Sequence, residues 1–143
     1  MARGAFSEID HAADLGLDLT GPDPAAVLEA AQRGLVHVLF GEDPALQPAV
    51  ERDVALVAGS YPELLKSWLD RLYQMMEEDA FVPVDTTVER SDPAGFRARV
   101  RGARVAAETL AAASELKAVT WHRLAFEPDP GGDGWRARVI FDV

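Results

Sequence analysis

The chain has 143 residues, with 24 acidic and 14 basic side chains, a formal net charge of −10 and no cysteine. This length suits a single domain, residues 1–143, which can bury a core without disulfides or structural metals. The lack of cysteine excludes a disulfide framework and a thiolate metal site, so oxygen or imidazole would have to hold any ion. The negative charge repels a phosphate backbone at long range, which argues against a general nucleic-acid binder.

The sequence also lacks targeting and membrane signals. Its first residues have no apolar run typical of a signal peptide, and no stretch approaches the ~18 apolar residues that span a bilayer. We therefore expect a soluble cytoplasmic protein with no membrane contact.

The first predicted elements are a strand and a helix. Leucines alternate with small or polar residues over 15–19, the period of a strand with one covered face, so Asp14 is expected at the mouth of this strand. Asp23 followed by Pro24 is typical of a helix start, and apolar residues at helical spacing continue until Gly41.

A second long helix is predicted after Ser60, which has the capping-box spacing to Glu63. Its apolar residues at helical intervals are predicted to be core: Leu64, Leu65, Trp68, Leu69, Leu72, Met75 and Met76. Further extended segments are predicted at 54–56, 81–84, 86–90, 96–101, 116–126 and 135–143. Two long helices among hairpin-connected strands indicate an α+β, two-layer sandwich, with both helices packed on a largely antiparallel β-sheet.

The last strand places an acidic side chain near the end of the sequence. By alternation, Asp142 points away from the face that carries the large apolar side chains. With the α-carboxylate expected on Val143, the local charge is about −2 at neutral pH. Such a cluster needs a counter-charge, either a bound cation or a basic side chain such as Lys117. Oxygen donors without cysteine suit Ca²⁺, Mg²⁺ or Mn²⁺ rather than Zn²⁺. Alone, an aspartate near a terminus is more often a solvated residue.

Three motifs occur in a fixed order along the chain: DHAADLG at 10–16, ELKAVTWH at 115–122 and VIFDV at 139–143. Together they resemble the archease family, small activators of the GTP-dependent RNA-splicing ligase. The resemblance implies the same α+β architecture. It also implies that Asp14, Asp142 and Val143 bind a divalent cation, calcium first, with Mg²⁺ or Mn²⁺ as alternatives.

The resemblance further implies a non-catalytic protein that promotes guanylylation of the ligase and its repeated turnover in tRNA splicing and RNA repair. The ligase is then the partner, and the chain interacts with RNA only indirectly, through the ligase. Activation is expected to depend on Asp14, Asp142 and Lys117. Lys117 alone has two interpretations, a surface lysine or a positive group offered to the acidic site, a partner or a nucleotide phosphate.

Two other functions stay open. One is a chaperone or specificity modulator of another tRNA-modifying enzyme, such as a tRNA methyltransferase. The other is a metal-dependent hydrolase, against which the sequence has no Gly-rich phosphate loop and no HExxH motif. Asp10 and His11 are expected to have structural roles, capping the turn and orienting their neighbours. The chain departs from the usual family motifs at Ala12, where threonine is common, and at Trp121, where tyrosine is common.

Overall fold

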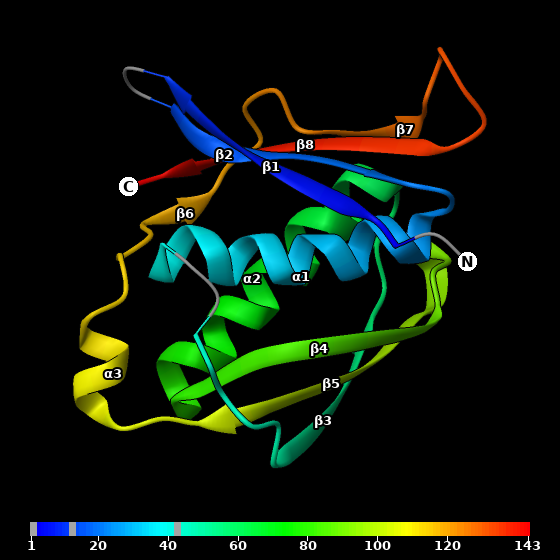
Figure 1. Ribbon diagram of the computed structural model, residues 1–143. Coiled ribbons are helices and arrows are strands. Elements are labelled where there is room, and N and C mark those ends of the chain that lie inside the picture. Colours follow the sequence, from blue (N-terminus) through cyan, green and yellow to red (C-terminus); the bar gives the residue numbers. More distant parts are fainter. Residues whose placement is uncertain (1–2, 12–13, 42–43) are drawn as a thin grey trace.

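The computed structural model describes residues 3–11, 14–41 and 44–143, although the side chains of residues 10, 11 and 14 are outside the description (Figure 1). The elements in the first half of the chain are β1 Ala5–His11, β2 Asp14–Gly21, α1 Pro24–Phe40, β3 Val50–Leu56 and α2 Tyr61–Asp79. Those in the second half are β4 Phe81–Arg90, the 3₁₀ turn η1 Pro93–Gly95, β5 Phe96–Arg104, α3 Ala107–Ala111, β6 Ala118–Val119, β7 Ala125–Pro128 and β8 Trp135–Asp142.

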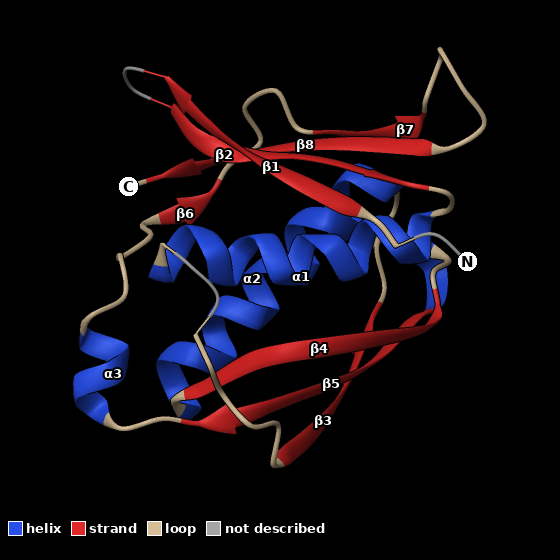
Figure 2. Cartoon of the chain, viewed as in Figure 1, coloured by secondary structure: helices blue, strands red, loops and turns tan. Residues whose placement is uncertain are grey.

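The two long helices lie between two antiparallel sheets (Figure 2). One sheet has the order β1-β2-β8-β6, with β7 also paired to β8, and the other has the order β3-β5-β4. Helix α1 contacts β2 in the first sheet and β4 in the second, and α2 contacts β7 and β4. The α+β class and the antiparallel pairing agree with the prediction. The predicted two-layer sandwich on one sheet differs from the structure, which has three layers.

The composition of α1 explains the extra layer. Most of its 17 residues are buried, including small ones on several sides of the helix. A helix that is apolar nearly all round must be covered on more than one face. A sheet on each side provides that cover.

Both long helices begin where the sequence predicts. The N–H of Ala26 donates to a side-chain oxygen of Asp23 at 2.8 Å, and that of Glu63 donates to the Ser60 hydroxyl at 3.3 Å. Helix α1 ends at Gly41, whose φ of 78° lies in the left-handed region that glycine adopts without strain. Of the helices in the described parts of the chain, none is both long and apolar enough to cross a membrane.

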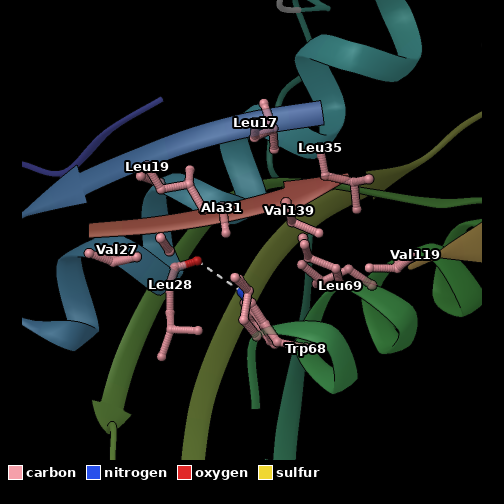
Figure 3. Close-up of a cluster of buried hydrophobic side chains, with 14 of the residues drawn as sticks. Leu17, Leu19, Val27, Leu28, Ala31, Leu35, Trp68, Leu69, Val119 and Val139 are labelled. Carbon is pink, nitrogen blue, oxygen red and sulfur yellow. Dashed lines mark hydrogen bonds between the residues drawn. The ribbon is translucent and has the colours of Figure 1, made fainter. Parts of the chain in front are cut away.

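The core surrounds the two helices (Figure 3). Trp68 of α2 is fully buried, and its indole N–H donates to the carbonyl oxygen of Leu28 on α1 at 2.9 Å. Its ring lies 5.1 Å from that of Phe96 on β5. From the other side, Leu17 on β2 and Val139 on β8 reach the same cluster. The predicted core face of α2 is confirmed, apart from Met75, which is only partly buried.

The structure differs from the predicted elements at three places. Strand β1, which pairs with β2 up to the position where His11 faces Asp14, is not among the predicted elements. The short helix α3 is not among them either. The single strand predicted over 116–126 is two short strands, β6 and β7, separated by a turn at 121–124. Both short strands pair with β8.

Candidate functional site

The five-stranded sheet brings the three sequence motifs to one of its ends. Leu15 of β2 pairs with Phe141 of β8, so Asp14 and Asp142 are each the next residue along their strands. On the other side of β8, Ala118 pairs with Asp142. Figure 1 shows the start of β2, the C-terminal end of β8 and β6 together at this end of the sheet. Residues more than 120 positions apart in the sequence are thereby neighbours.

Asp142 is fixed through its backbone and exposed at its side chain. Its carbonyl oxygen accepts a hydrogen bond from the N–H of Lys117 at 2.8 Å. Its carboxylate makes no ion pair with any residue whose side chain the structure describes. Val143 is also exposed, with 53% of its surface accessible. The backbone of Asp142 is therefore held in position, while its carboxylate is exposed and open to a ligand.

Of the three predicted ion ligands, the structure describes Asp142 and Val143 in full, but only the backbone of Asp14. The backbone of Asp14 begins β2, but its side chain, like those of Asp10 and His11, lies outside the description, as does the whole of Ala12. Among the side chains that are described, no group of three or more acidic or histidine residues forms a metal site. Asp14 is not among these described side chains. Oxygen donors at the adjacent ends of two strands fit a hard cation in chemical character, and the ligand set remains a prediction.

The backbone of Lys117 is hydrogen-bonded to the backbone of Asp142, and its side chain lines a cleft. This cleft, of about 490 Å³, lies between α2 and the segment 115–119. Asp70, Glu77 and Glu115 also line it. No carboxylate within the described residues lies within 4 Å of the Lys117 ammonium group. The lysine is thus a cation available to a partner, and its role in activation remains a prediction.

Sequence reasoning missed the role of Gly16, the last residue of DHAADLG. Gly16 pairs with Ile140, and a Cβ at this position would lie 2.2 Å from the carbonyl oxygen of Val139. Glycine therefore permits the close approach of β2 to β8 just before the predicted site. The available signal was a glycine inside an alternating strand pattern, which often marks such an approach.

The end of the ELKAVTWH motif holds β8 from the other side. The Thr120 hydroxyl donates to the carbonyl oxygen of Ile140 at 2.9 Å and accepts from the N–H of His122. The side chains of His122 and Trp121 are exposed, and Lys66 of α2 lies over the Trp121 ring at 5.4 Å.

Solved structures resemble this fold along almost its whole length. The solution structure of protein 1598 from Methanobacterium thermoautotrophicum has a TM-score of 0.78 and 25% sequence identity, covering 97% of this chain and 99% of that one. The crystal structure of a Thermotoga maritima protein, described as an archease and possible chaperone, has a TM-score of 0.64 and 20% identity, covering 94% of each chain. The second likeness supports the fold alone.

Sequence relatives agree with the structural ones. "Protein archease" of Methanosarcina barkeri is 27% identical over an alignment of 142 positions, and the match covers 96% of this chain and 95% of the relative. "Protein archease" of Pyrococcus furiosus is 26% identical over an alignment of 141 positions, and the match covers 96% of this chain and 98% of the relative. A sequence model of the Archease protein family (MTH1598/TM1083) matches residues 6–143. The chain therefore belongs to the archease family.

Proposed function

We propose that this chain is a non-catalytic activator of the GTP-dependent RNA-splicing ligase, promoting guanylylation of the ligase and its repeated turnover. The observation that supports the proposal is the strand register. It places Asp14 and Asp142 one residue beyond the Leu15–Phe141 pair, with Lys117 bonded to Asp142 from the other side. The motifs that carry the resemblance to this function thus meet at one end of the sheet, where a partner can reach them.

In this proposal Asp14, Asp142 and Val143 hold a hard divalent cation, calcium first, with magnesium or manganese as alternatives. Carboxylate and carbonyl oxygens are the ligands that these ions prefer. The bound cation supplies positive charge beside nucleotide phosphates. Asp142 presents its carboxylate from a backbone that the Lys117 N–H holds in place. The Lys117 ammonium group is offered to a phosphate or to an acidic residue of the ligase.

A second candidate function corresponds to the description of one structural neighbour, whose likeness to this chain shows the fold alone. The Thermotoga maritima protein is described as a possible chaperone. The corresponding role here is a chaperone or specificity modulator of another tRNA-modifying enzyme, such as a tRNA methyltransferase. A metal-dependent hydrolase is the third candidate. It is the only one of the three in which the isolated chain would itself catalyse a reaction.

The deciding experiment measures ligated RNA per ligase molecule over time, with substoichiometric ligase, GTP and manganese. The wild-type chain should support many turnovers. Asp142→Asn removes one charge at nearly constant shape and should reduce the reaction to about one turnover. Asp133→Asn is the matched control, because Asp133 is an exposed residue in the loop before β8 and also carries one charge. Lys117→Gln should cause a smaller loss.

The outcomes separate the three candidates. Failure of the wild-type chain to raise turnover would reject ligase activation. A gain in methyltransferase activity or yield with the same chain would then favour the modulator. Hydrolysis of phosphate esters by the chain alone, lost in Asp142→Asn, would favour the hydrolase. Full turnover with Asp142→Asn would reject the role of the acidic site while leaving activation itself standing.

A further inference from the structure

A second cavity lies on the outer face of the five-stranded sheet. Its volume is about 560 Å³, and its walls come from β2, β8, β7 and the turn that precedes β7. The polar residues that line it are Asp18, Thr20, Arg123, Glu127, Arg136 and Arg138. None of them belongs to the site described above. Three arginines thus line one cavity in a chain whose net charge is −10.

Two of these arginines are already oriented by carboxylates. In the sheet register, Arg138 faces Asp18 on β2, and its Nε and Nη2 donate to the two carboxylate oxygens at 2.7 and 3.0 Å. Arg136 faces Glu127 on β7, and the same two nitrogens donate to one oxygen at 3.1 and 2.9 Å. The hydrogen bond and the charge of Asp18 raise the pKa of Arg138 above its usual value. Each guanidinium keeps N–H groups that these bonds do not use.

The third arginine is held in an unfavourable backbone conformation. Arg123 has a φ of 52° in a turn that is closed by the N–H of Leu124 donating to the carbonyl oxygen of Trp121 at 3.2 Å. Glycine or asparagine adopts this left-handed region more readily than arginine does. Arg123 is exposed, and its guanidinium group has no ion-pair partner in the described parts of the chain. Backbone strain of this kind is often found at binding sites.

The charges in the cavity do not cancel. Asp18 and Glu127 neutralise two of the three guanidinium groups, and one positive charge remains, on Arg123. Arginine N–H groups match the oxygens of a phosphate in geometry, and several of them can share one dianion. The exposed Thr20 is opposite Arg136 in the register and adds a hydroxyl group.

We propose that this cavity binds a phosphate group, carried by a nucleotide or by a nucleic-acid chain, with Arg123 as the principal cation. Arg136 and Arg138, each paired with a carboxylate, provide further N–H donors. The site does not depend on ligase activation or on the ion at Asp142. A phosphate is favoured over a carboxylate because its additional oxygens can accept hydrogen bonds from more than one guanidinium group, and a terminal phosphate, unlike a backbone phosphodiester, also carries a second charge.

The test is direct binding to the full chain, by titration calorimetry at low ionic strength, with no ligase present. The probes are inorganic phosphate, GMP and an eight-nucleotide single-stranded RNA. Arg123→Gly removes the cation and accepts the positive φ without strain, so the variant should fold at least as stably as the wild type. The control is Arg97→Gln, which removes an equal charge from the exposed face of the other sheet.

We expect at least one probe to bind saturably to the wild type. Its affinity should fall at least tenfold in Arg123→Gly and stay within twofold in Arg97→Gln. Equal affinity for GMP and RNA would assign the site to a single phosphate. Tighter binding of RNA with a steep salt dependence would assign it to a nucleic-acid backbone. No saturable binding of any probe, or equal losses in the two variants, would overturn the proposal.

Discussion

The backbones of Lys117 and Asp142 are joined by a hydrogen bond of 2.8 Å from the N–H of the first to the carbonyl oxygen of the second. Both side chains are exposed. A substitution that changes only the side chain of either residue therefore leaves the bond between the strands intact. Loss of activity in such a variant can be separated from loss of the fold.

We expect calcium to raise the melting temperature of the wild-type chain and to have no such effect on Asp142→Asn. A ligand that binds only the folded state at 100 times its Kd stabilises it by about 2.7 kcal/mol, or roughly 5–10 °C for a domain of this size. Calorimetry with calcium, magnesium and manganese in turn provides the measurement. Asp133→Asn should keep the full shift. If none of the three ions moves the transition of the wild type, the predicted site is absent.

Gly16→Ala should destabilise the protein by about 1–3 kcal/mol, the usual cost of forcing extra volume into a packed site. The added Cβ would meet the carbonyl oxygen of Val139 at 2.2 Å, and backbone on a central strand cannot move away easily. Urea denaturation measures the change. Gly132→Ala is the control, because nothing lies within 4 Å of the position where its Cβ would be. Equal stability of the two variants would show that β2 and β8 are not so tightly apposed.

Helix ends were predictable because their signals are local. Asp23, Ser60 and Gly41 each act on backbone groups within four residues, and the structure shows all three in the expected roles. The apolar face of α2 likewise follows from its period alone. The chemistry of these residues needs no knowledge of the remainder of the chain.

The number of sheets was not predictable in this way. Val54 pairs with Ala98 in one sheet, whereas Leu17 pairs with Val139 in the other. The periodic pattern of a strand does not show which distant strand it pairs with. The two-residue strand β6 is too short to have a period at all. Hydrogen bonds to β8 hold it in place, among them the Lys117–Asp142 bond, which spans 25 positions of sequence. The motifs thus predict candidate site residues, and only the register shows that their backbones meet.

Trp68→Ala should cost about 3–5 kcal/mol of stability, as large truncations in a core do. Trp68 is fully buried, and its indole N–H satisfies the carbonyl oxygen of Leu28. Trp121→Ala is the contrasting variant, because 62% of Trp121 is exposed and its ring contact is with the surface Lys66. Its effect should be about 0.5 kcal/mol or less. Chemical denaturation of both variants tests the contrast, and similar costs would contradict this description of the core.

Thr86→Val should cost about 1–3 kcal/mol, the penalty for leaving a buried polar group without its partner. The Thr86 hydroxyl on β4 donates to the side-chain oxygen of the buried Gln32 on α1 at 3.0 Å. The amide nitrogen of Gln32 in turn donates to the carbonyl oxygen of Pro83 at 3.2 Å. Valine keeps the shape of threonine but supplies no donor, so the Gln32 oxygen would remain buried and unpaired. The neighbouring Thr87→Val change should be nearly neutral, because Thr87 is exposed. Urea denaturation that gave the two variants the same midpoint would show that this buried pair does not stabilise the contact between α1 and β4.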